Sequence, residues 1–160
     1  MSLSERPSRR FAILGLLALG GCGYTPIYGT GGTGNALRGA VAYTVPETVD
    51  GYNLGKRLQD RLGRTDGATN VLAVTISVTD AAGAIDRDNA STRISLPGTA
   101  VWTLTDMNGT VTASGEASAF SGYSNTGSTV ATRTAREDAR ARLMVALADQ
   151  IVTRLYAIAL

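Results

Sequence analysis

The stretch TRISLPGTAVWTLTDMNGTVTASGEASAF, residues 92–120, decides the fold. Both halves alternate apolar and polar residues, as expected of strands with one buried face. The apolar positions are Ile94, Leu96, Ala100, Trp102 and Leu104, then Val111, Ala113, Ala117 and Ala119. Asn108-Gly109 between the halves is typical of a two-residue hairpin turn. The stretch therefore predicts two antiparallel strands, 92–105 and 110–120, with a bulge or a sheet edge at Pro97-Gly98.

Upstream, the sequence predicts two more strands with a helix between them. Residues 71–79 alternate like those of the hairpin, and residues 40–45 (AVAYTV) form a short apolar run that ends at Pro46. Between them, leucines recur every four residues, which is the period of one helix face. These leucines are Leu54, Leu58 and Leu62, with Thr48 or Asp50 as the N-terminal cap and Gly63 as the C-terminal stop.

Downstream, a long helix closes the chain. Thr134 and Glu137 have the spacing of a capping box, which places the helix start there. Leu143, Leu147, Ile151 and Leu155 then form an apolar stripe. Three arginines on the first predicted turns oppose the helix dipole, so local stability does not explain them, and a bound anion or an acidic partner surface is one alternative. They are Arg133, Arg136 and Arg140.

The predicted fold class is α+β: a four-stranded, mainly antiparallel sheet with two helices packed on one face, in the order β-α-β-β-β-α. Residues 83–91 (GAIDRDNAS) are expected to be the exposed turn between the second and third strands. Residues 37–160 then form a single domain, and its length suffices for one hydrophobic core.

Composition argues against catalysis. The chain has no His and one Cys, which excludes a Ser-His-Asp triad, a His-ligated zinc ion, an internal disulfide and a CxxC motif. The formal charge of +2, without a basic run beyond the first ten residues, argues against nucleic acid as a partner. We therefore expect a protein that is not an enzyme and binds no metal or cofactor.

The N-terminus predicts export and lipidation. Three arginines precede ten apolar residues at 11–20 (FAILGLLALG). Ten helical residues span about 15 Å, half the hydrocarbon core, so residues 1–21 are expected to be a signal peptide. Two glycines directly before Cys22 match the bacterial lipobox, in which the Cys carries the lipid anchor. The alternative is a buried free Cys behind an ordinary signal peptide, which the glycine-rich GGCGY context disfavours.

Residues 22–36 are expected to be the lipidated N-terminus and a Gly-rich tether. The formal GxGxxG within residues 29–34 follows no strand, so it indicates this tether and not a dinucleotide site. Two or three acyl chains anchor a protein stably. Gly23, in place of the Asp that favours inner-membrane retention in enteric bacteria, favours the periplasmic side of the outer membrane. Without residues 1–21, which hold three Arg and Glu5, twelve basic and twelve acidic residues remain.

The segment Cys22–Gly29 (CGYTPIYG) resembles the mature start of alphaproteobacterial LptE, a lipopolysaccharide-assembly lipoprotein. The predicted element order is also similar to that family's. The resemblance implies a non-enzymatic lipoprotein that plugs the LptD outer-membrane barrel, helps to assemble it, and assists lipopolysaccharide delivery to the outer leaflet. A polar sheet face and a neutral mature charge suit a polar barrel lumen.

The resemblance also implies residues that contact lipopolysaccharide. Family members have a basic residue in the loop between the second and third strands, for which Arg87 is the nearest match and Arg93 the next. A second basic position on the last helix corresponds to Arg140 or Arg142. Two other functions stay open: a periplasmic lipoprotein adaptor of another envelope complex, and a lipid-carrying enzyme or receptor. The latter needs an apolar cavity or a carboxylate pair, and no such pair is visible in the sequence.

Overall fold

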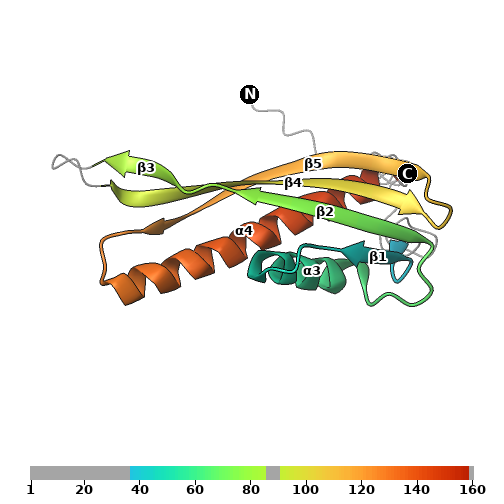
Figure 1. Ribbon diagram of the computed structural model, residues 1–160, viewed down its shortest axis with the longest axis horizontal. Helices are drawn as coiled ribbons and strands as arrows, with labels where there is room; N and C mark the ends of the chain where they lie inside the picture. The colour runs from blue at the N-terminus through green and yellow to red at the C-terminus, as the bar shows by residue number, and fades with distance from the viewer. Residues whose placement is uncertain (1–36, 86–90, 159–160) are drawn as a thin grey trace, which may run out of the picture.

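The computed structural model describes residues 37–85 and 91–158, and it confirms the predicted α+β class. One mixed sheet carries both helices on the same face, with the long last helix running beneath it (Figure 1). The strands are β1 (Val41–Thr44), β2 (Asn70–Val78), β3 (Ala81–Ile85), β4 (Ser91–Asp106) and β5 (Val111–Ser124). The helices are α3 (Val49–Leu62) and α4 (Thr129–Ile158). The expected signal peptide, Cys22, the expected tether and Arg87 lie outside the described residues.

Strand β4 is the centre of the sheet. It pairs antiparallel with β5 along most of its length, with β2 through residues 98–106, and with β3 through residues 91–95. Strands β2 and β3 therefore share one side of β4, and β1 adds to β2 as the only parallel pair of the described sheet. The four predicted strands and their order are confirmed, and β3 is an additional short strand.

Strand β3 corrects the expected turn at residues 83–91. Residues 83–85 lie in β3 and Ser91 begins β4, so only residues 86–90 fall between the strands, outside the described part. The sequence of β3, AAGAI, gives little sign of a strand, because it has neither alternation nor several β-branched residues.

The expected bulge at Pro97-Gly98 is absent, and the expected edge exists only on one side of β4, where Pro97 lies between the residues paired with β3 and those paired with β2. The pairing with β5 runs through Pro97 without a register shift. The Pro97 carbonyl accepts a hydrogen bond from the Thr79 amide at 3.1 Å. The nitrogen and the carbonyl of one strand residue point to the same side, so the Pro97 nitrogen also faces the junction between β2 and β3. No ladder hydrogen bond is lost there, which explains how a central strand accommodates a proline.

The hairpin turn between β4 and β5 is longer than Asn108-Gly109 predicts. The Gly109 amide bonds the Asp106 carbonyl at 3.1 Å, and the Asp106 amide bonds the Thr110 carbonyl at 2.9 Å. Three residues therefore form the loop, and Gly109 takes a φ of 85°, as the left-handed residue of such a loop requires. The sequence located the turn correctly but gave the wrong turn type.

Asp106 stabilises this turn, which makes the turn sensitive to acid. Its Oδ1 accepts hydrogen bonds from the amides of Thr110 and Asn108, at 2.8 and 2.9 Å. The Thr110 amide is the main reason that the pKa of Asp106 is lowered. A lowered folded-state pKa contributes stability above the ordinary value of about 4, and this contribution is lost as the pH falls through the folded-state pKa.

We therefore expect the free-energy difference between the wild type and Asp106→Asn to be largest near pH 7 and to shrink as the pH falls below 4. Urea unfolding of both proteins at pH 7 and at pH 3 measures this difference. A difference that stays constant between the two pH values contradicts the assignment.

Helix α4 begins six residues before the start that the capping box predicts. It starts at Thr129, and the Ser128 hydroxyl accepts a hydrogen bond from the Ala131 amide at 3.3 Å. Thr134 lies inside the helix and donates to the Val130 carbonyl. The first turn gives no apolar signal because it lies beyond the core, with Val130 65% exposed.

The core lies between the helices and the inner sheet face. It is built from the predicted leucines of α3, the predicted stripe of α4 and the inward residues of β2 and β4. Thr48 is the N-cap of α3 and Gly63 ends the helix, as predicted. None of the described helices is long and apolar enough to cross a membrane.

Candidate functional site

Two of the four predicted lipopolysaccharide-binding arginines meet at one pocket. Arg93 comes from β4 and Arg142 from α4, and both line an open pocket of about 580 Å³ at the end of the sheet where β3 and β5 meet β4. The pocket is completed by Ser95, Phe120, Ser121 and Gly122. We call this the Arg93–Arg142 pocket.

Register and hydrogen bonding position its two arginines. In the sheet, Arg93 is paired with Ala84 of β3 and with Ser124 of β5. Arg142 bonds the Asp138 carboxylate one turn earlier in α4 and donates to the Gly122 carbonyl at 3.3 Å. Since a guanidinium has five N–H groups, these bonds orient Arg142 and leave N–H groups for an anion.

Phe120 gives the pocket an apolar component. Its side chain points to the outer side of the sheet and is 80% exposed, the highest exposure of any described large apolar residue. A cationic pair beside an exposed aromatic ring suits a ligand that joins a phosphate to a ring or an acyl chain. The sequence indicates that Phe120 points outward, because in the alternating strand it falls on the same face as the polar residues Thr112, Ser114, Glu116 and Ser118.

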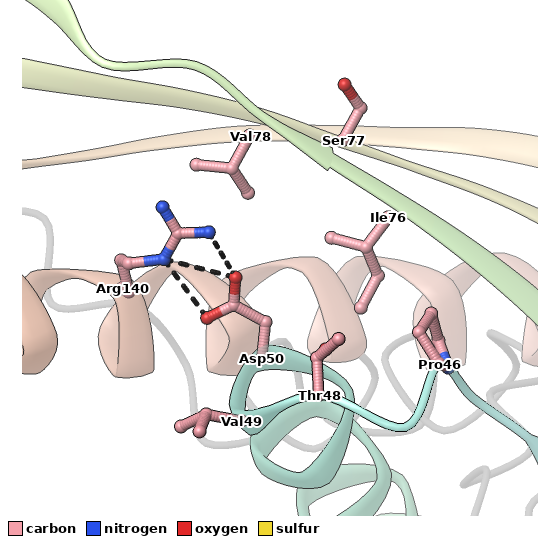
Figure 2. Close-up of a pocket in the computed structure, with 8 residues that line it drawn as sticks. All are labelled: Pro46, Thr48, Val49, Asp50, Ile76, Ser77, Val78 and Arg140. Carbon is pink, nitrogen blue, oxygen red and sulfur yellow. Dashed lines mark hydrogen bonds and ion pairs between the residues drawn. The ribbon is translucent and has the colours of Figure 1, made fainter.

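Arg140 lies in a different pocket, which Figure 2 shows. This pocket, also about 580 Å³, lies between the start of α3, the end of β2 and helix α4. Asp50 points from α3 towards the guanidinium, and Arg140 Nε lies 3.2 and 3.1 Å from its two carboxylate oxygens (Figure 2). Hydrogen bonding to Asp50 is the main reason that the pKa of Arg140 is raised.

Acidic residues of the domain itself explain two of the three arginines near the start of α4. Arg140 pairs with Asp50, and Arg136 pairs with Asp80, which lies between β2 and β3. The alternative of a bound anion or an external acidic partner is therefore not required for these two. Because α4 begins earlier than predicted, both arginines also lie beyond its first turn, where their unfavourable interaction with the helix dipole is weaker.

A second ion pair links α3 and α4 across the groove between them, and the sequence did not indicate it. Arg57 of α3 bonds Asp149 of α4 at 3.0 and 2.9 Å in a two-pronged arrangement. This interaction raises the pKa of Arg57. Val145, 40% exposed, lies in the same groove. In residues 37–85 and 91–158, no group of three or more side chains is arranged to hold a metal ion.

The comparisons with known proteins agree with this architecture. A putative lipoprotein from Caulobacter crescentus CB15 is 24% identical with a TM-score of 0.64, and the match covers 74% of this chain and 89% of that one. A minor lipoprotein from Acinetobacter baumannii is 21% identical with a TM-score of 0.56, covering 73% and 90%. The rare lipoprotein B from Shewanella oneidensis is 12% identical with a TM-score of 0.56, covering 74% and 92%. At these identities the likeness shows the fold.

A search of curated proteins gave no match. The family model described as LptE, lipopolysaccharide-assembly, matches residues 39–155, which include all of the described strands and most of α4. Because this match spans more than half of the chain, the protein belongs to the LptE family of lipopolysaccharide-assembly proteins.

Proposed function

We propose that this protein is the lipid-anchored plug of an LptD barrel, on the periplasmic side of the outer membrane. In this role it helps the barrel to assemble, assists the delivery of lipopolysaccharide to the outer leaflet, and catalyses no reaction. The family match carries the proposal. Two of the similar solved structures are of lipoproteins, and they support the anchor together with the lipobox pattern before Cys22.

The Arg93–Arg142 pocket is our proposed contact for lipopolysaccharide. Lipopolysaccharide carries phosphates, and guanidinium groups bind phosphate oxygens through paired hydrogen bonds. The exposed Phe120 ring beside them offers an apolar contact for the rest of the lipid. Arg140 is not included, because it lies in the other pocket, where its pair with Asp50 is much less exposed than the pair of Arg142 with Asp138. Arg87 stays a prediction of the resemblance.

The double variant Arg93→Ala/Arg142→Ala is expected to bind lipopolysaccharide at least about tenfold more weakly, since each charge-assisted contact is worth roughly 1.5–3 kcal/mol. Titration of labelled lipopolysaccharide with the full-length protein in detergent measures this. The matched control is Lys56→Ala/Arg64→Ala, which removes two positive charges elsewhere on the domain. Equal binding by both double variants and the wild type would rule out the pocket as the contact.

Depletion of the chain in its host tests the proposed role as a whole. We expect the amount of correctly assembled barrel to fall, and newly made lipopolysaccharide to accumulate before it reaches the outer leaflet. Surface labelling of lipopolysaccharide and the heat-modifiable mobility of the barrel report the two effects, and re-expression of the wild type should restore both. If both stay normal during depletion, the proposed function is wrong.

A further inference from the structure

The loop between β4 and β5 contains the one Asn-Gly dipeptide of the sequence, Asn108-Gly109. The loop lies at one end of the sheet (Figure 1), and Asn108, Gly109 and Thr110 are all exposed. Apart from the chain neighbours of Gly109, no atom of the described residues lies within 4 Å of the position that a Cβ atom on Gly109 would take. Water therefore reaches the Asn108 side-chain amide and the peptide bond that follows it.

An asparagine that precedes a glycine can lose its side-chain amide without an enzyme. The glycine backbone nitrogen forms a bond to the asparagine Cγ, the Cγ–Nδ2 bond breaks, and the proton of the backbone nitrogen leaves with the amide group as ammonia. Water then opens the resulting imide ring at either carbonyl, and the product is aspartate or isoaspartate. Glycine favours the first step because it has no Cβ to obstruct the approach. Water is the only co-reactant.

The geometry of the loop slows this reaction but does not prevent it. The Asn108 side chain is held weakly, because its Nδ2 donates to Asp106 Oδ2 at 3.4 Å, longer than a typical hydrogen bond. The Gly109 amide donates to the Asp106 carbonyl at 3.1 Å, and this bond must open before the nitrogen can attack. Local opening of an exposed loop costs much less free energy than global unfolding. The reaction is therefore accessible in the folded protein.

The product acts against the residue that stabilises the loop. Asp106 Oδ1 accepts hydrogen bonds from the amides of Asn108 and Thr110. Conversion of Asn108 to aspartate replaces the Nδ2 donor by a carboxylate oxygen beside Asp106, and two neighbouring carboxylates repel each other. Isoaspartate has a further effect, since it adds one methylene group to the backbone of a loop that is closed by the bond between Gly109 and Asp106.

We propose that Asn108 is a site of spontaneous deamidation, and that its product loosens the β4–β5 loop by placing a second carboxylate beside Asp106. The reaction adds one negative charge to residues 22–160, which carry twelve basic and twelve acidic side chains. Because ammonia is lost, the change runs in one direction and accumulates with the age of the molecule. The inference is independent of the proposed function, since it involves only water and residues of the loop.

Ageing of the purified full-length protein in detergent, in mildly alkaline buffer at physiological temperature, tests the site. Peptide mapping by mass spectrometry measures the converted fraction of Asn108 over days, and labelling by an isoaspartate methyltransferase identifies the isoaspartate product. The matched control in the same molecule is Asn125, which is exposed in the loop before α4 and precedes Thr126. We expect Asn125 to react at least about tenfold more slowly, a difference of about 1.4 kcal/mol in activation free energy.

Asn108→Asp measures the effect of the new charge without ageing. We expect this variant to have a lower urea midpoint than the wild type at neutral pH. The loss should shrink in an Asp106→Asn background, where the second carboxylate is absent. The matched control is Asn125→Asp, which adds the same charge just before α4. A negative charge near a helix N-terminus is favourable, so this control is expected not to lower the midpoint.

Two sets of results overturn the inference. If Asn108 stays intact in the folded protein while the urea-unfolded chain converts it, or if Asn125 reacts as fast as Asn108, the loop is not a selective site of deamidation. If Asn108→Asp has the wild-type midpoint, or loses as much in the Asp106→Asn background as in the wild type, the product does not act through Asp106.

Discussion

Replacing Gly51 by Ala is expected to lower the free energy of unfolding by about 3 kcal/mol, at the upper end of typical overpacking costs. Gly51 is buried in the first turn of α3 and faces the segment that enters the helix from β1. A Cβ atom at this position would lie 2.0 Å from the Pro46 carbonyl oxygen. Because the obstacle is backbone, relief requires movement of the β1–α3 connection.

Gly55→Ala is the matched control in the same helix. Its Cβ would lie 3.3 Å from Val45 Cγ2, a side-chain atom that can shift. The higher helix propensity of Ala, worth about 1 kcal/mol, offsets that contact, so we expect a change within about 1 kcal/mol. Urea unfolding followed by circular dichroism compares the two variants. Equal midpoints for both would show that the packing of Pro46 on α3 does not constrain the fold.

Replacing Trp102 by Ala is expected to cost about 3–5 kcal/mol, the range for large aromatic residues in cores. Trp102 is 1% exposed, and its ring lies against Gly115 of β5. The indole Nε1–H is buried and makes no hydrogen bond within the described residues. Trp102→Phe removes this unsatisfied donor, which is unfavourable when buried. We therefore expect Trp102→Phe to lose much less free energy of unfolding than its decrease in side-chain volume alone predicts. Urea unfolding of the two variants, followed by circular dichroism, measures both losses.

A double-mutant cycle with Gly115 isolates this contact. A Cβ at residue 115 would lie 2.8 Å from Trp102 Cζ2, so Gly115→Ala is expected to destabilise the wild type by about 1–3 kcal/mol. In a Trp102→Leu background the same change should cost little, because the ring is gone. An equal cost in both backgrounds would mean that the ring does not lie against Gly115.

Alternation and leucine periodicity were enough to predict the four main strands, both helices and their order. The stripe of α4 and the leucines of α3 are the core residues that the structure buries. Such patterns are informative because they mark the buried face of each helix and strand, and these faces pack together to form the sheet and helix layers. They fail where a segment lies outside the core, as at the start of α4, or where small residues form a strand, as in β3.

Tertiary context decided the details that were wrong. The gap between β2 and β3 accommodates Pro97 in a central strand, and nothing near Pro97 in the sequence reports that gap. The hairpin error is local instead: Asp106 caps the amides of Asn108 and Thr110 in a three-residue loop, where Asn-Gly alone suggested two. Propensity is a weak guide wherever a long-range partner satisfies the backbone.

The candidate site was predictable in its residue types but not in its grouping. Four arginines were selected, and the structure brings Arg93 and Arg142 to one pocket while Arg140 is paired with Asp50 elsewhere. Residues so far apart in the sequence meet only through the packing of α4 under β4 and β5. The outward direction of Phe120 follows from strand alternation, so the sequence also carried this part of the pocket.

The most direct test of the central claim is a gentle detergent extraction of the tagged full-length protein, with mass identification and quantification of what remains bound. Our account predicts an LptD-type outer-membrane barrel in a one-to-one ratio with this chain. A free monomer, or an inner-membrane or cell-wall partner in place of the barrel, would contradict the proposal that this LptE-family protein acts as a barrel plug.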